Sequence, residues 1–156
     1  MINFNADIIS RHSIGNVILN DNIEKYFSEM YSNFNVEKIE YRIPDGNKKI
    51  AYILSDVMKV VTTECGVIFS IGCNQGYKGF YNAFLHTGQT MRDIIKLTRR
   101  QRIFNGSIIV NDDFGISFIL PHPYDEIADS ISDIPHDLVF NEIYIADYSS
   151  WNPCAN

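Results

Sequence analysis

The chain has 156 residues and a net charge of −6 at pH 7, from 13 Lys and Arg against 19 Asp and Glu. This length fits one domain spanning residues 1–156, and 46% hydrophobic residues suffice for a sizeable core. An acidic chain is a poor general ligand for nucleic acid. No apolar run nears the ~20 residues that span a bilayer, and no signal-peptide pattern opens the chain. The three cysteines lack the spacing of a disulfide framework, which favours a reducing compartment. We therefore expect a cytoplasmic protein.

The first third of the chain predicts one strong helix. Residues 14–19 form a short apolar stretch, either a strand or the approach to that helix. Asn20 or Asp21 can then cap a helix, because a short side-chain oxygen accepts a hydrogen bond from a first-turn N–H. Apolar residues recur at helical spacing through residues 23–34, so the helix is expected there.

The middle of the chain predicts strands. Residues 39–43 and 50–54 alternate between apolar and polar positions, and residues 44–47 (PDGN) have the composition of a hairpin turn. Further strands are expected at residues 58–61 and 67–71. Short connections require antiparallel neighbours, so the sequence predicts a meander of about four strands.

A second helix is expected from Thr90, where Asp93 completes a pattern like a capping box, and it is expected to end in Arg99, Arg100 and Arg102. Strands at 108–110 and 116–120 then flank a turn at 111–115, residues 124–135 form a short helix or a long loop, and residues 138–146 form a last strand. The whole predicts an α+β single domain: a mainly antiparallel sheet of six to seven strands, with two main helices packed on one face.

No motif assigns a reaction. The glycines at 72, 76 and 79 lack a phosphate-binding spacing, and Asp113-Phe114-Gly115 lies between two alternating runs, as a hairpin turn would. The four histidines are far apart and lack the close pairs of a zinc site. We therefore expect no catalytic residue, no metal and no cofactor, and a protein that is not an enzyme.

The location of the charge is more informative than its total. All thirteen Lys and Arg lie in residues 1–102, which also hold ten acids, for a balance of +3. Residues 103–156 hold the other nine acids and no Lys or Arg, for a balance of −9. Two interpretations are open: a solvated acidic face that keeps the protein soluble, or a docking surface for a basic partner.

Aromatic residues among these acids favour docking, because aromatics are common interface anchors. Phe140 and Tyr144 could equally belong to the core. The candidate partner-binding residues are Asp112, Asp113, Tyr124, Asp125, Glu126, Asp129, Asp133, Tyr148 and Trp151. Within this set Tyr124 and the acids at 125, 126, 129 and 133 are favoured, because they cluster in a segment bounded by prolines that should be exposed.

Four segments resemble small bacterial immunity proteins, including those of contact-dependent growth inhibition systems. They are Gly15–Leu19 followed by Ile23, Gly79 with Leu85, Gly88 and Thr90, Gly115–Phe118, and Ile143–Ile145. The resemblance implies a cytoplasmic protein that binds and neutralises the C-terminal toxin domain of a delivered effector. Many such toxins are basic nucleases, which an acidic surface would suit. Binding residues do not carry over position by position.

Three functions therefore stay open. The first is an immunity protein that occludes the active or substrate-binding site of its toxin, without contacting nucleic acid or membrane itself. The second is a small ligand-binding or enzymatic α+β domain with a pocket between sheet and helices. The third is an oligomeric adaptor, since a free edge strand of the meander would allow a homodimer.

Overall fold

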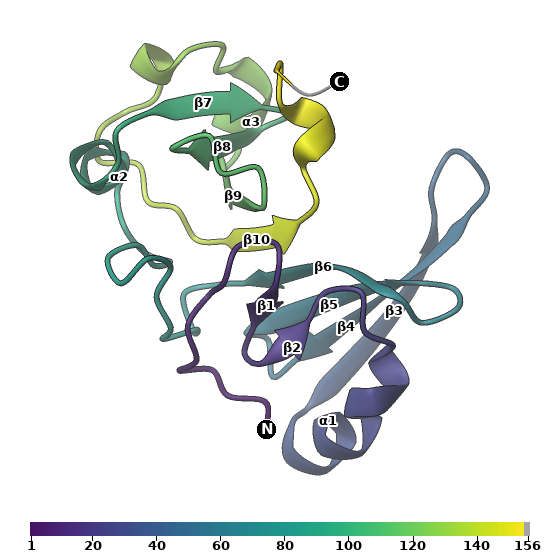
Figure 1. Cartoon of the computed structure of the whole chain (residues 1–156). Helices are drawn as coiled ribbons and strands as arrows, with labels where there is room; N and C mark the ends of the chain where they lie inside the picture. Colours follow the sequence, from purple (N-terminus) through teal and green to yellow (C-terminus); the bar gives the residue numbers. More distant parts are fainter. Residues whose placement is uncertain (155–156) are drawn as a thin grey trace.

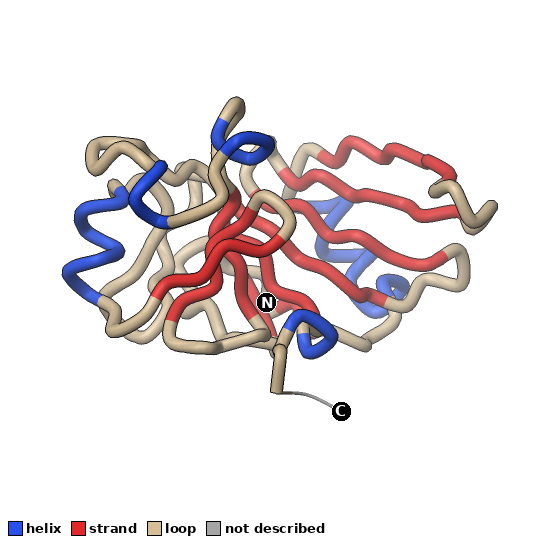
Figure 2. Tube along the Cα trace, turned by 90° about the horizontal axis from the view of Figure 1, so that it is seen from above, coloured by secondary structure: helices blue, strands red, loops and turns tan. Residues whose placement is uncertain are grey.

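The computed structural model describes residues 1–154, in which an eight-stranded sheet runs through the molecule (Figure 1). The strands of this sheet are β3 (Val36–Arg42), β4 (Lys48–Leu54), β5 (Met58–Thr63), β6 (Ile68–Cys73), β7 (Gln101–Phe104), β8 (Ser107–Val110), β9 (Ile116–Ile119) and β10 (Ile143–Ala146). A separate hairpin consists of β1 (Ser13–Ile14) and β2 (Val17–Ile18). Seen from above, the strands form a continuous twisted band with short helices at its margins (Figure 2).

The sheet is built from two meanders that β10 joins. The strand order is β3-β4-β5-β6-β10-β9-β8-β7, and every neighbouring pair is antiparallel. β10 pairs with β6 on one side, where Ile145 lies opposite Ile71, and with β9 on the other, where it lies opposite Ile116. A strand late in the chain thus occupies the middle of the sheet, and β3 and β7 are its edges.

The α+β class and the first meander are confirmed, while the expected six to seven strands are too few. Residues 101–104 form β7, although Arg102, with Arg99 and Arg100 before it, was expected to end a helix. The turn between β7 and β8 at residues 105–106 is Asn-Gly, and both residues have the positive φ of a tight hairpin turn. In the last expected strand, only residues 143–146 pair in the sheet.

The helices are short. A 3₁₀ turn, η1 (Ile23–Tyr26), continues into α1 (Phe27–Asn33), so the first helix lies where it was expected, but Asn22 caps it through Glu24 N–H, rather than Asn20 or Asp21. The second helix is α2 (Met91–Leu97). Residues 124–135 contain α3 (Tyr124–Ile127) and η2 (Ile131–Asp133), and η3 (Ser149–Trp151) follows β10. No helix in residues 1–154 has the length and apolar character to cross a membrane.

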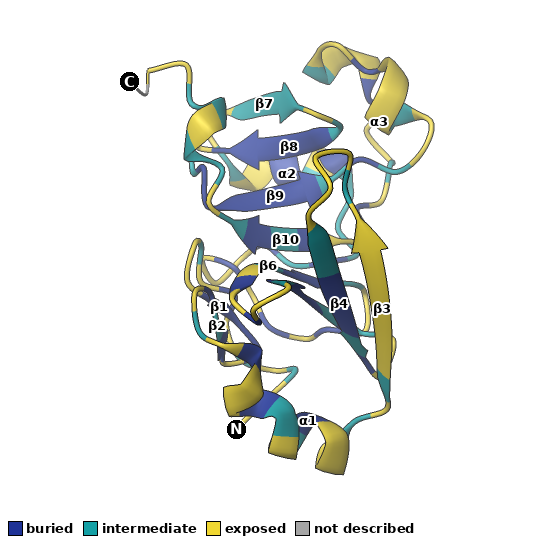
Figure 3. Ribbon diagram, turned by 90° about the vertical axis from the view of Figure 1, so that its right-hand side faces the viewer, coloured by how far each residue is buried: buried dark blue, intermediate teal, exposed yellow. Residues whose placement is uncertain are grey.

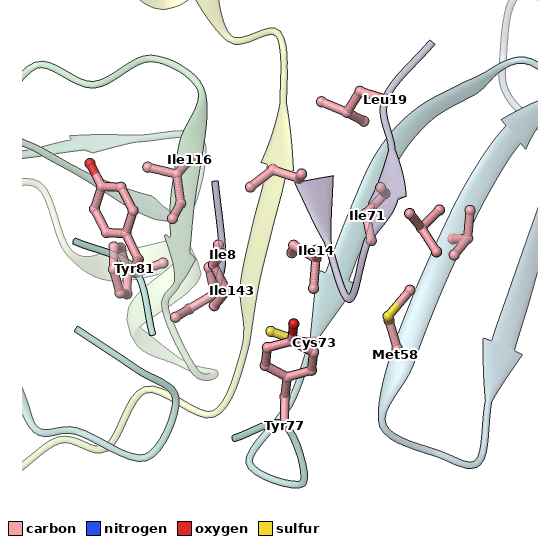
Figure 4. Close-up of a cluster of buried hydrophobic side chains, with 14 of the residues drawn as sticks. Ile8, Ile14, Leu19, Met58, Ile71, Cys73, Tyr77, Tyr81, Ile116 and Ile143 are labelled. Atoms are coloured by element: carbon pink, nitrogen blue, oxygen red, sulfur yellow. The ribbon is translucent and has the colours of Figure 1, made fainter. Parts of the chain in front are cut away.

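The core lies on one face of the sheet, which we call the inner face. Registers place Met58, Cys73, Ile143 and Phe118 in one row across β5, β6, β10 and β9, and all four are buried. Figure 4 shows Ile14 and Leu19 of the N-terminal hairpin region beside Ile71 and Cys73. The β1–β2 hairpin therefore covers the inner face of the first meander.

Hydrogen bonds and close packing hold this hairpin in place. Gly15 has φ of +61°, a backbone conformation that favours glycine, and a Cβ there would lie 2.8 Å from Met58 Sδ. The Gly15 N–H donates to Tyr77 Oη at 2.8 Å, and Tyr77 donates in turn to the Ala6 carbonyl at 2.5 Å. Burial raises the pKa of Tyr77, in keeping with a neutral hydroxyl at this junction.

Candidate functional site

Five of the predicted residues lie together in one exposed segment, residues 121–133, which we call the acidic segment. Pro121 and Pro123 end β9 and lead into α3, whose Tyr124 carbonyl accepts from Ala128 N–H. Ala128 is buried beneath the segment, as is Ile134 directly after it. These two apolar side chains fix the segment to the body of the protein and leave its acids in solvent.

The exposed acids of this segment surround an exposed apolar side chain. Asp125, Glu126 and Asp129 are exposed, and Ile127 among them is 61% exposed. Figure 3 shows α3 as an exposed element beyond the buried strands β8 and β9. Within residues 1–154 no Lys or Arg forms an ion pair with the segment, and within it His122 Nδ1 lies 3.2 Å from Asp125 Oδ1. The segment therefore presents uncompensated negative charge beside apolar surface.

Asp133 has a structural role within the same segment. Its carboxylate accepts from the backbone N–H of Asp129 and of Ser130, both at 3.1 Å. These N–H bonds stabilise the charged carboxylate and lower the pKa of Asp133. Asp133 therefore shapes the loop as the last residue of the capping box of η2, and Asp125, Glu126 and Asp129 are the acids available to a partner.

The other two predicted acids lie in the turn between β8 and β9, and both contact other residues of the protein. Asp112 lies 3.3 Å from Arg100 Nη1 and 2.9 Å from Arg102 Nε, although that N–H is not aligned for a hydrogen bond. Asp113 accepts from Ser10 Oγ, from Tyr81 Oη and from Gly115 N–H. Basic residues before position 103 thus neutralise part of the acidic last third of the sequence.

Tyr148 and Trp151 pack on the outer face of the second meander. Their rings stack with centroids 4.5 Å apart, Trp151 also stacks on Phe104, and Phe104 meets Phe114 edge-on. Tyr148 Oη lies 3.0 Å from Ser117 Oγ, and burial raises the pKa of Tyr148. Both predicted anchors are thus half-buried parts of an aromatic cluster.

The nine predicted residues therefore occupy two places in the structure. The acidic segment adjoins the turn between β7 and β8, where a Cβ on Gly106 would lie 3.0 Å from the Asp125 carbonyl oxygen. The aromatic cluster adjoins the turn between β8 and β9, where Tyr148 N–H donates to the Phe114 carbonyl. The two groups are neighbours in the sequence, but they lie beside turns at opposite ends of the four-residue strand β8.

Sequence reasoning missed a second exposed surface, the loop of residues 80–84. Phe80 and Phe84 are 42% and 66% exposed, and Asn82 and Ala83 both have positive φ. The loop borders a hollow of about 340 Å³ that is open to solvent and lined in part by Asp7. The aromatic content of residues 77–84 was the available signal, because exposed aromatic side chains on a loop are typical of contact surfaces.

Two other features bear on ligand chemistry. A hollow of about 240 Å³ on the outer face is lined in part by Lys59, Glu142 and Tyr144. His122, Asp125 and Glu126 offer ligand atoms within 4.8 Å of one another, and all three are exposed. Exposed acids beside a histidine are common without an ion, so this group alone assigns no metal.

Comparison with known proteins shows the fold alone. No protein-family model matches the chain, and no curated protein matches it. Among solved structures it is similar to the uncharacterized protein yfeY from Escherichia coli, with a TM-score of 0.60 and 11% sequence identity. The match covers 88% of this chain and 98% of that one, so the likeness extends over nearly the whole architecture.

Proposed function

We propose that the chain is an immunity protein that binds a cognate bacterial toxin domain, a basic nuclease, and neutralises it by occluding its active or substrate-binding site. The observation that carries the proposal is the acidic segment, where Asp125, Glu126 and Asp129 are exposed without a Lys or Arg partner in residues 1–154. A nuclease binds phosphates through clustered Lys and Arg, so carboxylates spaced along an exposed segment can occupy the same positions.

The chemistry of the acidic segment supplies both rate and specificity. Complementary charge speeds the encounter of two proteins and disfavours wrong partners, and both effects weaken as salt rises. Ile127 and the half-buried Tyr124 add apolar contact beside the acids. Such contacts exclude water and strengthen the neighbouring charged pairs.

The test replaces the three available acids and spares the structural one. The variant Asp125→Asn, Glu126→Gln, Asp129→Asn is compared with the matched control Glu24→Gln, Asp56→Asn, Glu64→Gln, which removes the same charge from exposed acids elsewhere. The binding partner for the test is taken as the C-terminal domain of the protein that the neighbouring reading frame encodes, and the measurements are calorimetric affinity at several salt concentrations and rescue of growth.

We expect the acidic-segment variant to bind at least about tenfold more weakly, a loss of ~1.4 kcal/mol, and to show a shallower salt dependence. The control should bind like the original chain. Equal affinity and equal salt dependence for the two variants would contradict the proposal.

The second candidate function, a small-ligand-binding domain, is favoured by the hollow beside Lys59, Glu142 and Tyr144. Its volume of about 240 Å³ is below the ~300–1,000 Å³ usual for ligand pockets. Chemical-shift mapping with a fragment library distinguishes the two functions, because a ligand site there would concentrate the shifts on these residues.

A further inference from the structure

The edge strand β3 offers a free row of backbone hydrogen-bonding groups. Ile43 N–H donates to the Asn47 carbonyl at 3.0 Å and Ser55 N–H to the Asn35 carbonyl at 2.7 Å, so the odd-numbered residues of this strand direct their backbone groups toward β4. Backbone direction alternates along an antiparallel strand. The even-numbered residues Val36, Lys38, Glu40 and Arg42 therefore direct theirs outward, away from the sheet.

The side chains of β3 are exposed on both faces. Every residue after Val36 in this strand is exposed, and Figure 3 shows β3 as the exposed strand along the margin of the sheet beside the buried β4. The even-numbered positions after Val36 carry charge, with Lys38 and Glu40 3.5 Å apart along the same face. The odd-numbered positions include Ile39 and Tyr41, each 40% exposed on the outer face.

We propose that two copies of this chain pair through β3 as antiparallel strands, with the two-fold axis at Ile39 and with Lys38 of each copy opposite Glu40 of the other. The two eight-stranded sheets then form one continuous sheet. The occupant of this edge is a second copy, and the proposal does not depend on the toxin-binding function.

Symmetry limits the registers that such a dimer can use. A two-fold axis perpendicular to the sheet keeps each face on its own side, so a residue must lie opposite one of the same parity. With the axis at Lys38, the two Lys38 side chains face each other. With the axis at Glu40, the two Glu40 side chains face each other and Lys38 faces Arg42. Like charges directly opposite are destabilising.

The register centred on Ile39 is the one near the middle of β3 that brings opposite charges together. Lys38 and Glu40 form two symmetric pairs, and their outward backbone groups exchange hydrogen bonds. Ile39 then meets its own copy at a position without backbone hydrogen bonds, where side chains approach most closely. Glu40 keeps its own bond to Lys48 at 2.9 Å in this arrangement.

The same charges explain why a second copy fits better than an unrelated strand. Charged side chains on an edge strand discourage indiscriminate pairing. Opposite charges meet when the Lys-Ile-Glu pattern of one copy runs antiparallel to that of the other, and like charges meet when the two patterns run parallel in register. The charges therefore favour the antiparallel pairing of two copies.

A disulfide reports the register. The exposed cysteines are first removed as Cys65→Ser and Cys154→Ser, while Cys73 is buried. Ile39→Cys is then compared with Tyr41→Cys, which lies on the same face with the same 40% exposure. In the proposed register position 39 of one copy lies directly opposite position 39 of the other, whereas the two copies of position 41 are separated by four residues, roughly 13 Å along the strand.

We expect mild oxidation to link Ile39→Cys into a covalent dimer at least about tenfold faster than Tyr41→Cys, because disulfides require Cα atoms within ~7 Å. Equal rates, or faster linkage of Tyr41→Cys, would overturn the register. A single monomeric species in analytical ultracentrifugation of the unmodified chain up to 100 µM would overturn the dimer.

Charge exchange gives an independent readout. Lys38→Glu places Glu opposite Glu40 in both halves of the interface and should raise the dimer dissociation constant about tenfold or more. The double variant Lys38→Glu, Glu40→Lys restores opposite charges and should recover most of that loss. Failure of the double variant to recover dimerisation while the monomer keeps its melting temperature would contradict the proposed pairing.

Discussion

Single side chains join parts of this protein that are distant in sequence. Asp113 lies in the turn between β8 and β9, yet it accepts from Ser10 near the N-terminus and from Tyr81 in the loop before α2. Burial and the hydrogen bond to Asp113 both raise the pKa of Tyr81. Asp-Phe-Gly was correctly predicted as a turn, but its aspartate also ties three segments together, which no local pattern could reveal.

Tyr26 predicts a dependence of stability on alkaline pH. Its hydroxyl donates to Asp21 Oδ2 at 2.6 Å and accepts from Ile18 N–H at 3.1 Å. Burial, followed by the bond to Asp21, raises the pKa of Tyr26 to about 12. Because the folded state holds this proton more tightly, its contribution is complete below the unfolded pKa of ~10 and is lost as pH rises toward 12.

The variant Tyr26→Phe should therefore lower the free energy of unfolding by about 1–2 kcal/mol at pH 8 and flatten its decline between pH 10 and 12. Urea unfolding at a series of pH values measures both effects. Tyr31→Phe, at an exposed tyrosine of α1, is the matched control. An unchanged alkaline slope in Tyr26→Phe would show that this hydroxyl does not titrate with unfolding.

At the scale of elements, local signals worked where a capping or turn motif was complete. Thr90 Oγ1 accepts from Asp93 N–H at 3.3 Å, and the Asp93 carboxylate accepts from Thr90 N–H at 3.1 Å. The backbone N–H bond from Thr90 is the main reason that the pKa of Asp93 is lowered. This reciprocal pair fixes the start of α2 at the residue that the sequence predicted.

Thr90→Ala should lower the free energy of unfolding by about 1 kcal/mol, because it leaves a first-turn N–H without its partner. Thr90→Ser keeps the oxygen and should cost much less. Chemical denaturation compares the two variants. Equal losses would indicate that the methyl group of Thr90, and not its cap, supplies the stability.

Local sequence signals predicted the wrong element where the same residues suited two kinds of structure. Arg99, Arg100 and Arg102 suited the end of a helix, but Arg102 lies in β7 and pairs with Asp112 in the turn after β8. Residues 138–142 are apolar enough for a strand, yet Phe140 is a core residue on a loop and contacts Phe118 edge-on. In both cases the structure depends on contacts with residues outside the segment, which the local sequence does not reveal.

At the scale of the whole molecule, stability should depend most on the strand that joins the meanders. Ile145 of β10 is fully buried between Ile71 and Ile116. The antiparallel class was predictable from alternation and short turns. The central position of β10 was not, because nothing local distinguishes a strand that closes a sheet from one that ends it.

Ile145→Ala should lower the free energy of unfolding by about 2–5 kcal/mol, since it leaves a cavity where both meanders pack. Ile127→Ala, at a residue 61% exposed, should change it by less than about 0.5 kcal/mol. Thermal and urea unfolding of the two variants test the difference. A loss below about 1 kcal/mol for Ile145→Ala would show that the sheet relaxes around the junction.

The place of β10 also sets an order of events during synthesis. Both meanders emerge from the ribosome before residues 143–146, so until then β6 and β9 each have a bare flank. Bare flanks of hydrophobic strands are sites of unwanted pairing between nascent chains. Slow translation between residues 119 and 143 would lengthen that vulnerable interval, and completion of β10 closes both flanks in one step.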